Sequence, residues 1–188
     1  MKINKTFLTY SGVVIIGILG LSFGAYAYIK STPQYSLYET YLAIKNRNYD
    51  SFSKYVDVNS VIDNTIDKLL SQQNNPTNPN DKTAQELTKG IVQLFRGTIK
   101  DAATREIQKS IEQGSLIQPN QVGSSSPNIL LNADIKRNGS IATVSLFLEN
   151  GKQVSLQMRW KGSYWQIFNA DLDSLGIGTN MLNAPTSN

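Results

Sequence analysis

Cysteine and histidine are both missing from this sequence of 188 residues. Without cysteine there are no disulfides, thiolate zinc sites or cysteine nucleophiles, and no lipoprotein attachment point. Without histidine there are no imidazole metal ligands, no Ser-His-Asp triad and no histidine general base. Phosphate loops, dinucleotide-binding glycine motifs, nucleophile elbows and calcium loops are absent as well. We therefore expect no catalytic site, no metal and no cofactor.

An excess of positive over negative charge is also lacking outside the N-terminal region. The net charge is +4, and residues 1–30 supply +3 of it because they hold three lysines and no acid. The remaining chain carries 15 basic and 14 acidic side chains, a net charge of +1. Nucleic-acid binding needs a broad basic face that neutralises phosphates. We therefore expect no nucleic-acid partner.

Apolar residues are concentrated in residues 7–29, a run of 23 amino acids without a charge. As a helix the run measures about 34 Å, enough to cross a hydrocarbon core of about 30 Å. Lys2 and Lys5 precede it, whereas only Lys30 follows closely. The positive-inside rule then predicts one span of the bacterial inner membrane, with a cytoplasmic N-terminus and an extracytoplasmic domain. The alternative is a signal peptide cleaved after Ala27, but the length of the run favours a retained anchor.

Glycines recur along one face of this predicted membrane helix. Gly17, Gly20 and Gly24 share that face, and Gly20 and Gly24 form a G-x-x-x-G motif. Such motifs let two membrane helices approach closely, so they predict a homodimer. The alternative is that they reflect only the general frequency of glycine in membrane helices.

The exported part begins with helical patterns. Thr32 and Pro33 are typical of a helix start, and a helix with tyrosines at positions 35, 38 and 41 is expected to about residue 47. Asp50 is expected to cap a short helix carrying Phe52 and Tyr55, and another helix follows over 58–70. A longer amphipathic helix is expected over 82–113. Its predicted apolar face comprises Leu87, Ile91, Leu94, Phe95, Ile99, Ala102, Ala103, Ile107 and Ile111.

The hydrophobic period then changes from 3.6 to 2, which predicts strands. They are expected over 129–137, 140–149, 153–160 and 164–172, joined by tight turns at Asn138-Gly139, Asn150-Gly151 and 161–163. The predicted fold class is α+β: an N-terminal transmembrane helix, then a helical half packed on a four-stranded antiparallel meander. The expected domains are an anchor over 1–30, an exported α+β domain over 31–175 and a flexible tail over 176–188.

Two segments carry a resemblance to a known family. Residues 32–38 read TPQYSLY, and residues 43–57 read AIKNRNYDSFSKYVD. Together with Arg159-Trp160 and the closing run over 165–172, they resemble the bacterial domain-of-unknown-function family numbered 2939. The resemblance covers roughly residues 31–173. It implies a domain just outside the membrane with no established activity, similar to the cystatin-like fold of nuclear transport factor two and ketosteroid isomerase.

Five residues are candidates for lining a ligand pocket. They are Tyr38, Tyr41, Trp160, Trp165 and Asp171. The two tryptophans flank one turn, so they are expected to pair there as a core or hairpin contact or to form a cavity wall. Asp171 and Asp173 lie on one side of a strand, where they bind a cation or share a proton, or else form a solvated strand end near Arg159 or Lys161.

These observations favour a non-catalytic protein anchored in the membrane. Its exported domain is expected to bind a protein partner or a small apolar ligand. One alternative is an enzyme of the ketosteroid-isomerase type with Asp171 as its carboxylate and tyrosines as donors. Another is a structural or assembly role through pairing of the membrane helix.

Overall fold

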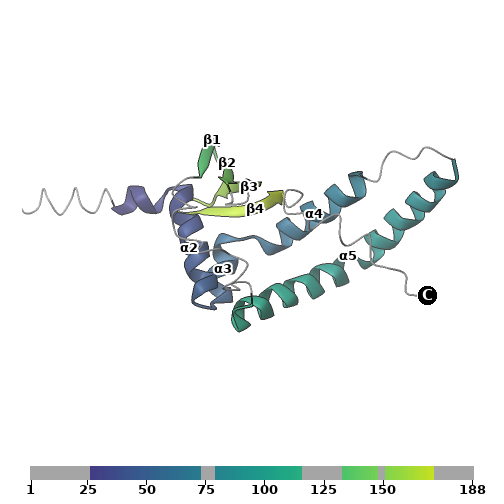
Figure 1. The fold of residues 1–188 in the computed structure, drawn as a ribbon, viewed down its shortest axis with the longest axis horizontal. Coiled ribbons are helices and arrows are strands. Elements are labelled where there is room, and N and C mark those ends of the chain that lie inside the picture. Colours follow the sequence, from purple (N-terminus) through teal and green to yellow (C-terminus); the bar gives the residue numbers. More distant parts are fainter. Residues whose placement is uncertain (1–25, 73–78, 116–132, 148–150, 172–188) are drawn as a thin grey trace, which may run out of the picture.

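A computed structural model describes residues 26–72, 79–115, 133–147 and 151–171 (Figure 1). Within these ranges a short helical stretch over 26–30 precedes four longer helices and one sheet. The helices are α2 (Pro33–Lys45), α3 (Tyr49–Tyr55), α4 (Val58–Gln72) and α5 (Pro79–Gln113). The strands are β1 (Asp134–Asn138), β2 (Ile141–Phe147), β3 (Gln153–Trp160) and β4 (Trp165–Asp171). The α+β class is thereby confirmed.

The sheet is the predicted four-stranded antiparallel meander, with strand order β1-β2-β3-β4. One turn was predicted a residue too early. Asn138 pairs with Ile141, so the hairpin loop is Gly139-Ser140 and not Asn138-Gly139. Gly139 has a φ of 58°, a conformation that glycine adopts without steric cost, and this residue sets the turn.

The helix starts follow from side-chain caps. The Thr32 hydroxyl accepts a hydrogen bond from the Tyr35 N–H at 3.2 Å, which confirms the predicted start of α2. The prediction that Asp50 caps the next helix is wrong. Asn48 caps α3 by accepting from the Ser51 N–H at 2.8 Å, and Asp50 lies within the first turn. A carboxylate in a first turn still interacts favourably with the helix dipole.

The core lies between the sheet and helices α2, α3 and α4. Three strand residues, Ala142, Val144 and Met158, are fully buried there. On α2 the buried side differs from the tyrosine stripe, because Ser36 and Thr40 are buried and Tyr38 is exposed. Small polar residues let the helix approach β4 closely, and the Ser36 Oγ accepts from the Trp165 backbone N–H at 2.9 Å.

The linker between α3 and α4 joins the helical half to the sheet. Val56 forms a parallel bridge with Ile167, and the Asp57 N–H donates to the Ile167 carbonyl at 2.8 Å. One turn into α4, the Asn64 amide donates to the Phe168 carbonyl at 2.9 Å. These bonds satisfy backbone groups along the outer edge of β4, which would otherwise be open to pairing with another strand.

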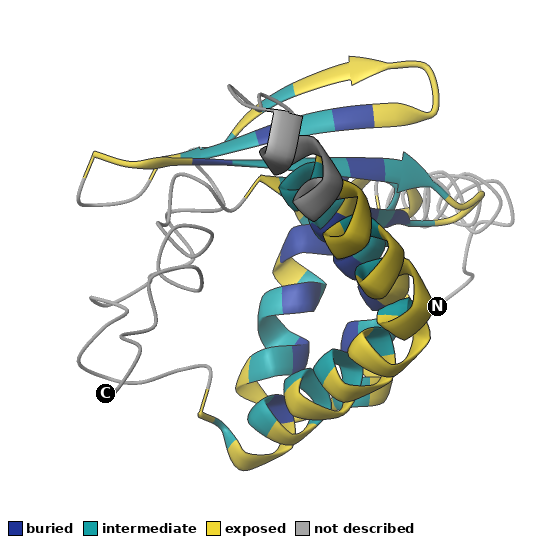
Figure 2. Cartoon of the chain, turned by 90° about the vertical axis from the view of Figure 1, so that its right-hand side faces the viewer, coloured by how far each residue is buried: buried dark blue, intermediate teal, exposed yellow. Residues whose placement is uncertain are grey.

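Helix α5 packs on α4 through ion pairs and is exposed along much of its length (Figure 2). Arg96 binds Asp63 and Asp67, each at 2.8 Å, and Lys100 binds Asp63 at 2.6 Å. The ammonium of Lys100 and the guanidinium of Arg96 lower the pKa of Asp63. Part of the predicted apolar face contacts the core, including the buried Ile111.

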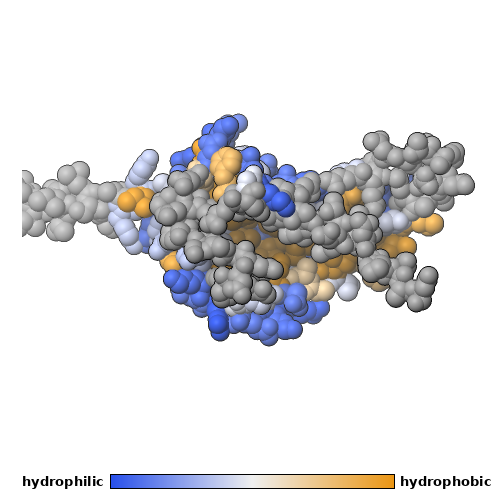
Figure 3. All heavy atoms as spheres, viewed as in Figure 1, coloured by the Kyte–Doolittle hydropathy of each residue, from blue (hydrophilic) through white to orange (hydrophobic). Residues whose placement is uncertain are grey.

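The remainder of that predicted apolar face lies outside the core. The following apolar side chains are exposed: Leu87, Ile91, Leu94, Phe95 and Ile99. The reason is geometric, because α4 has 15 residues against 35 in α5 and covers only one side of the longer helix. Figure 3 shows apolar atoms gathered along this helical pair.

The predicted membrane anchor lies almost entirely outside the described residues. In the part of the chain that the structure describes, none of the helices has the length and apolar character needed to span a bilayer.

Candidate functional site

A cleft of about 330 Å³ lies where the β3–β4 hairpin meets the helical half. We call it the Arg159 cleft. Its walls come from α3, the α3–α4 linker, the C-terminal half of α5 and the hairpin. The side chains that line it include Tyr49, Asp57, Thr104, Arg159, Lys161 and Gln166. The lining is predominantly polar and includes two cations against one carboxylate.

Asp57 is fixed in the cleft by the start of α4. Its carboxylate accepts from the Ser60 N–H at 3.0 Å and from the Ser60 hydroxyl at 2.8 Å. The other partner is Arg159, whose Nη2 donates to the same carboxylate. Burial acts to raise the pKa of Asp57, but the hydrogen bonds from Ser60 and the charge of Arg159 outweigh it, and the pKa is lowered. Asp57 is therefore ionised at neutral pH and bound to Ser60 and Arg159.

Arg159 keeps hydrogen-bonding capacity beyond this ion pair. Its Nη2 also reaches the Gln166 Oε1 at 3.4 Å, and its guanidinium lies 5.5 Å from the centre of the Phe168 ring. Its Nε is buried and has no hydrogen-bond partner. A buried donor without a partner costs about 1–3 kcal/mol.

Thr104 contributes a second buried polar atom without a partner, its Oγ1. Hydroxyls of helical threonines commonly bond to the carbonyl four residues earlier. Thr40 and Thr65 do so here, donating to Ser36 and Val61 at 2.8 Å each. Thr104 lacks this local bond although it lies within α5. Both buried unpartnered side-chain atoms of the described residues therefore belong to residues that line one cleft.

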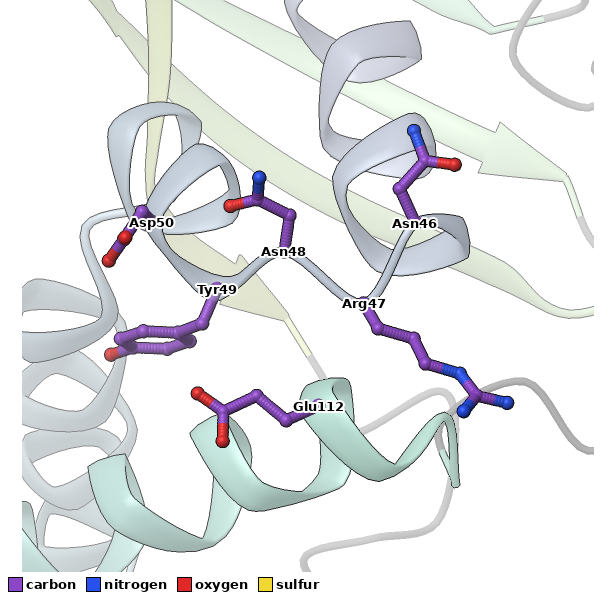
Figure 4. Close-up of a pocket in the computed structure, with 6 residues that line it drawn as sticks. All are labelled: Asn46, Arg47, Asn48, Tyr49, Asp50 and Glu112. Atoms are coloured by element: carbon purple, nitrogen blue, oxygen red, sulfur yellow. The ribbon is translucent and has the colours of Figure 1, made fainter.

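A second cleft of about 320 Å³ adjoins the first, and Tyr49 lines both (Figure 4). Its other residues are Asn46, Arg47, Asn48, Asp50 and Glu112. Burial and the nearby Asp50 carboxylate raise the pKa of Tyr49, so its hydroxyl is neutral at neutral pH. Figure 4 shows the Glu112 carboxylate on the Tyr49 side of the cleft and the Arg47 side chain pointing away from it.

Two matching helix ends shape this second cleft. The Asn48 N–H donates to the Ala43 carbonyl at the end of α2, and the Ser115 N–H donates to the Ser110 carbonyl at the end of α5. The residue in the left-handed conformation is Gly114 just after α5, whereas it is Arg47, with a φ of 56°, just after α2. A β-carbon on Gly114 would lie 2.8 Å from the Arg47 Nε, so glycine leaves room for the arginine.

The structure brings together two of the five residues proposed for a pocket. The rings of Trp160 and Trp165 lie 5.5 Å apart across the turn, which confirms the predicted pair. Trp165 is fully buried in the core. Tyr38 is exposed and Tyr41 is half-buried, both on α2. None of these four, nor Asp171, lines either of the two clefts.

The expectation that Asp171 lies near Arg159 or Lys161 is wrong. Asp171 pairs with Lys68 of α4 at 2.7 Å, because β4 runs alongside that helix, whereas Arg159 pairs with Asp57. Asp173 and the three glycines at 17, 20 and 24 lie outside the described residues. The acidic side chains of the described residues form no group of three that suits a metal ion.

Sequence reasoning did not identify Thr104 or Asp57 as site residues, and it assigned Arg159 a different partner. No local signal marks them, since Asp57 and Arg159 are 102 positions apart and meet only through the packing of α4 on β4. Comparison with known protein families, curated proteins and solved structures gives no match.

Proposed function

We propose that this chain is a membrane-tethered binding protein of the bacterial cell envelope. Residues 7–29 hold it in the inner membrane with the N-terminus in the cytoplasm. The exported domain holds a small anionic ligand in the Arg159 cleft and catalyses no reaction. The tether is supported by the 23-residue uncharged run and by the lysines that precede it.

One observation carries the proposal of a ligand: among the described residues, the two buried side-chain polar atoms without partners belong to residues of one cleft. The Arg159 Nε is a donor and the Thr104 hydroxyl is both donor and acceptor, so an anionic oxygen with a neighbouring polar group satisfies both. The charges of the lining also favour an anion, because two cations, Arg159 and Lys161, line the cleft together with one carboxylate, Asp57. This lining favours a polar anion over the small apolar ligand expected from the sequence.

The same geometry argues against acid–base catalysis. A general base works best with a pKa near the operating pH. Asp57 has a lowered pKa and is already bound by Ser60 and Arg159. Asp171, the carboxylate of the ketosteroid-isomerase alternative, has a half-exposed side chain paired with Lys68. In that enzyme type, an apolar site is what keeps a carboxylic acid protonated so that it can donate a hydrogen bond.

Thr104→Val tests the ligand site through two opposite effects. The substitution replaces an unpartnered buried hydroxyl by a methyl group, so we expect the free energy of unfolding to rise by about 1 kcal/mol. We also expect binding of the anion to weaken about five- to tenfold, the value of one hydrogen bond. The measurements are urea unfolding and isothermal titration of the detergent-solubilised full chain with acetate, succinate and inorganic phosphate, and with ethanolamine as the cationic comparison.

Thr98→Val is the matched control, since Thr98 lies on the same helix and is exposed. It is expected to change neither quantity. The proposal fails if none of the three anions binds, or if Thr104→Val binds the anion as tightly as Thr98→Val does.

Reporter fusions after Lys30 test the tether independently. We expect activity from a reporter that works only outside the cytoplasm, together with recovery of the full-length chain in the membrane fraction. Activity confined to the cytoplasmic reporter reverses the predicted topology. A shortened chain recovered outside the membrane identifies residues 1–27 as a cleaved signal peptide.

A further inference from the structure

The exposed apolar side chains of α5 form one continuous surface, which we call the α5 strip. It consists of Leu87, Ile91, Leu94, Phe95 and Ile99. Leu94 is 82% exposed, and Leu87 is 63% exposed. Single exposed leucines are ordinary, but a row of five large apolar residues along one helix is typical of an interaction surface.

The strip faces away from the helix that holds α5 in place. Arg96 contacts α4 through Asp63 and Asp67, and Leu94 lies two positions earlier, about 200° around the helix. Helix α4 therefore does not cover the strip. Gly90 and Gly97 lie beside Leu94, and a β-carbon on either glycine would meet no atom within 4 Å. A second helix has room to approach closely along this side.

The charges beside the strip are compatible with an identical surface. Residues 90–95 carry no charged side chain. The cations that follow, Arg96 and Lys100, are held on the opposite side by the carboxylates of α4. Two copies brought strip to strip meet no like-charge repulsion over this stretch.

The apolar area of the α5 strip is also sufficient for a specific interface. Five large side chains exposed to this degree present on the order of 500 Å² of apolar surface, within the range of the largest patches on monomers. Two strips in contact bury on the order of 1,000 Å² from these residues alone, the level at which specific interfaces begin. Flanking residues of α5 add to that area.

The proposed tether supplies the second copy in the required orientation. Residues 26–30 lie at one end of the described part of the chain, and the α4–α5 pair extends toward the other end (Figure 1). Copies held in one membrane by their N-terminal segments are concentrated near each other, with their helical pairs pointing the same way. A two-fold axis along the long axis then places strip against strip.

We propose that two copies of this chain associate through the α5 strip, so that the two α5 helices pack against each other in parallel, with each α4 on the outer side of its own α5. The orientation rests on the membrane tether of the proposed function. The G-x-x-x-G motif predicted from the sequence at Gly20 and Gly24 offers a second contact between the two copies within the membrane.

Cysteine cross-linking of the full chain in membranes tests the interface, because the natural sequence contains no cysteine. We expect Leu94→Cys to form a disulfide-linked dimer under mild oxidation. Gln93→Cys is the control, since Gln93 is exposed on the same helix but lies about 100° around the helix from Leu94, on the side opposite the strip. A result in which the two variants cross-link equally, or neither does, overturns the proposal.

Leu94→Glu tests the same contact by mass measurement of the solubilised chain. We expect the dimer fraction to fall at least tenfold while the melting temperature of the monomer is unchanged, because the side chain is 82% exposed. Gly20→Ile distinguishes the contribution of the proposed membrane-helix contact from that of the α5 strip. It is expected to weaken the dimer without abolishing Leu94→Cys cross-linking. A monomeric natural chain overturns the proposal.

Other occupants of the strip give different outcomes. If another segment of the same chain covers it, Leu94→Glu lowers the melting temperature and no intermolecular disulfide forms. If a different protein covers it, the purified chain is monomeric. Either outcome contradicts association of two copies. Cross-linking tests the α5 interface, whereas the reporter fusions test the membrane tether. Each proposal can therefore be contradicted without contradicting the other.

Discussion

Trp165→Ala is expected to destabilise the exported domain by about 3–5 kcal/mol, a large part of the stability of a typical domain. The indole is fully buried, so its removal leaves a cavity in the core. It also removes a hydrogen bond, because the indole Nε1 donates to the Ser31 carbonyl at 2.9 Å. Urea unfolding of the solubilised full chain, followed by far-ultraviolet circular dichroism, measures the loss.

The position of Trp165 explains why the effect is large. Its backbone N–H and its indole N–H bond to two different residues of the α2 region, Ser36 and Ser31. Its ring lies 5.5 Å from the Trp160 ring and 4.8 Å from the Arg137 guanidinium. One side chain thus joins the β3–β4 hairpin to the start of the helical half, next to the segment that leads from the proposed anchor.

Two further variants show whether burial and hydrogen bonding act as argued. Trp165→Phe keeps an aromatic ring but loses the indole N–H, so it is expected to cost about 1–2 kcal/mol. Tyr38→Ala removes another aromatic side chain that is 41% exposed, and it is expected to cost less than about 1 kcal/mol. Equal losses for Tyr38→Ala and Trp165→Ala contradict this account of the core.

The strand half of the fold was predictable because its signals are local. Alternation of apolar and polar residues placed β3 at its observed bounds. The turn between β1 and β2 was misplaced by one residue, because an Asn-Gly pair does not reveal whether the asparagine itself is paired. The positive φ of Gly139 fits a loop that begins at this glycine. A φ angle belongs to the folded backbone and cannot be read from the sequence.

The helical half was predicted less well because apolar spacing does not identify the neighbour of each face. The pattern in α5 placed Leu94 on an apolar face, but it did not reveal that no described element covers this side chain, which is 82% exposed. On α2 the closest approach uses Ser36, a polar residue that periodicity ignores, because its partner Trp165 is 129 positions away. The Arg159 cleft was missed for the same reason, since the Asp57–Arg159 contact at its centre joins residues 102 positions apart.

Asp57 is the residue of that cleft whose loss is expected to cost the most stability. Asp57→Ala removes the acceptor for the Ser60 N–H at the start of α4 and leaves Arg159 without its carboxylate. Loss of a helix cap and of a charged hydrogen bond together predicts a cost of about 2–3 kcal/mol at pH 7. Asp57→Asn keeps a cap acceptor but loses the charge, so a smaller cost of about 1–2 kcal/mol is expected.

The pH dependence of this stabilisation distinguishes the charge from the cap. The pKa of Asp57 is lower in the folded chain than the value of about 3.9 for an unfolded aspartate. Its contribution is therefore complete above the unfolded pKa and is lost as the pH falls through the folded pKa. We expect the difference in unfolding free energy between the natural chain and Asp57→Asn to shrink between about pH 5 and pH 3. Asp171→Asn is the control, because that half-exposed ion pair contributes little at any pH. A difference for Asp57→Asn that stays constant over this range means that the Arg159–Asp57 charge pair does not stabilise the fold.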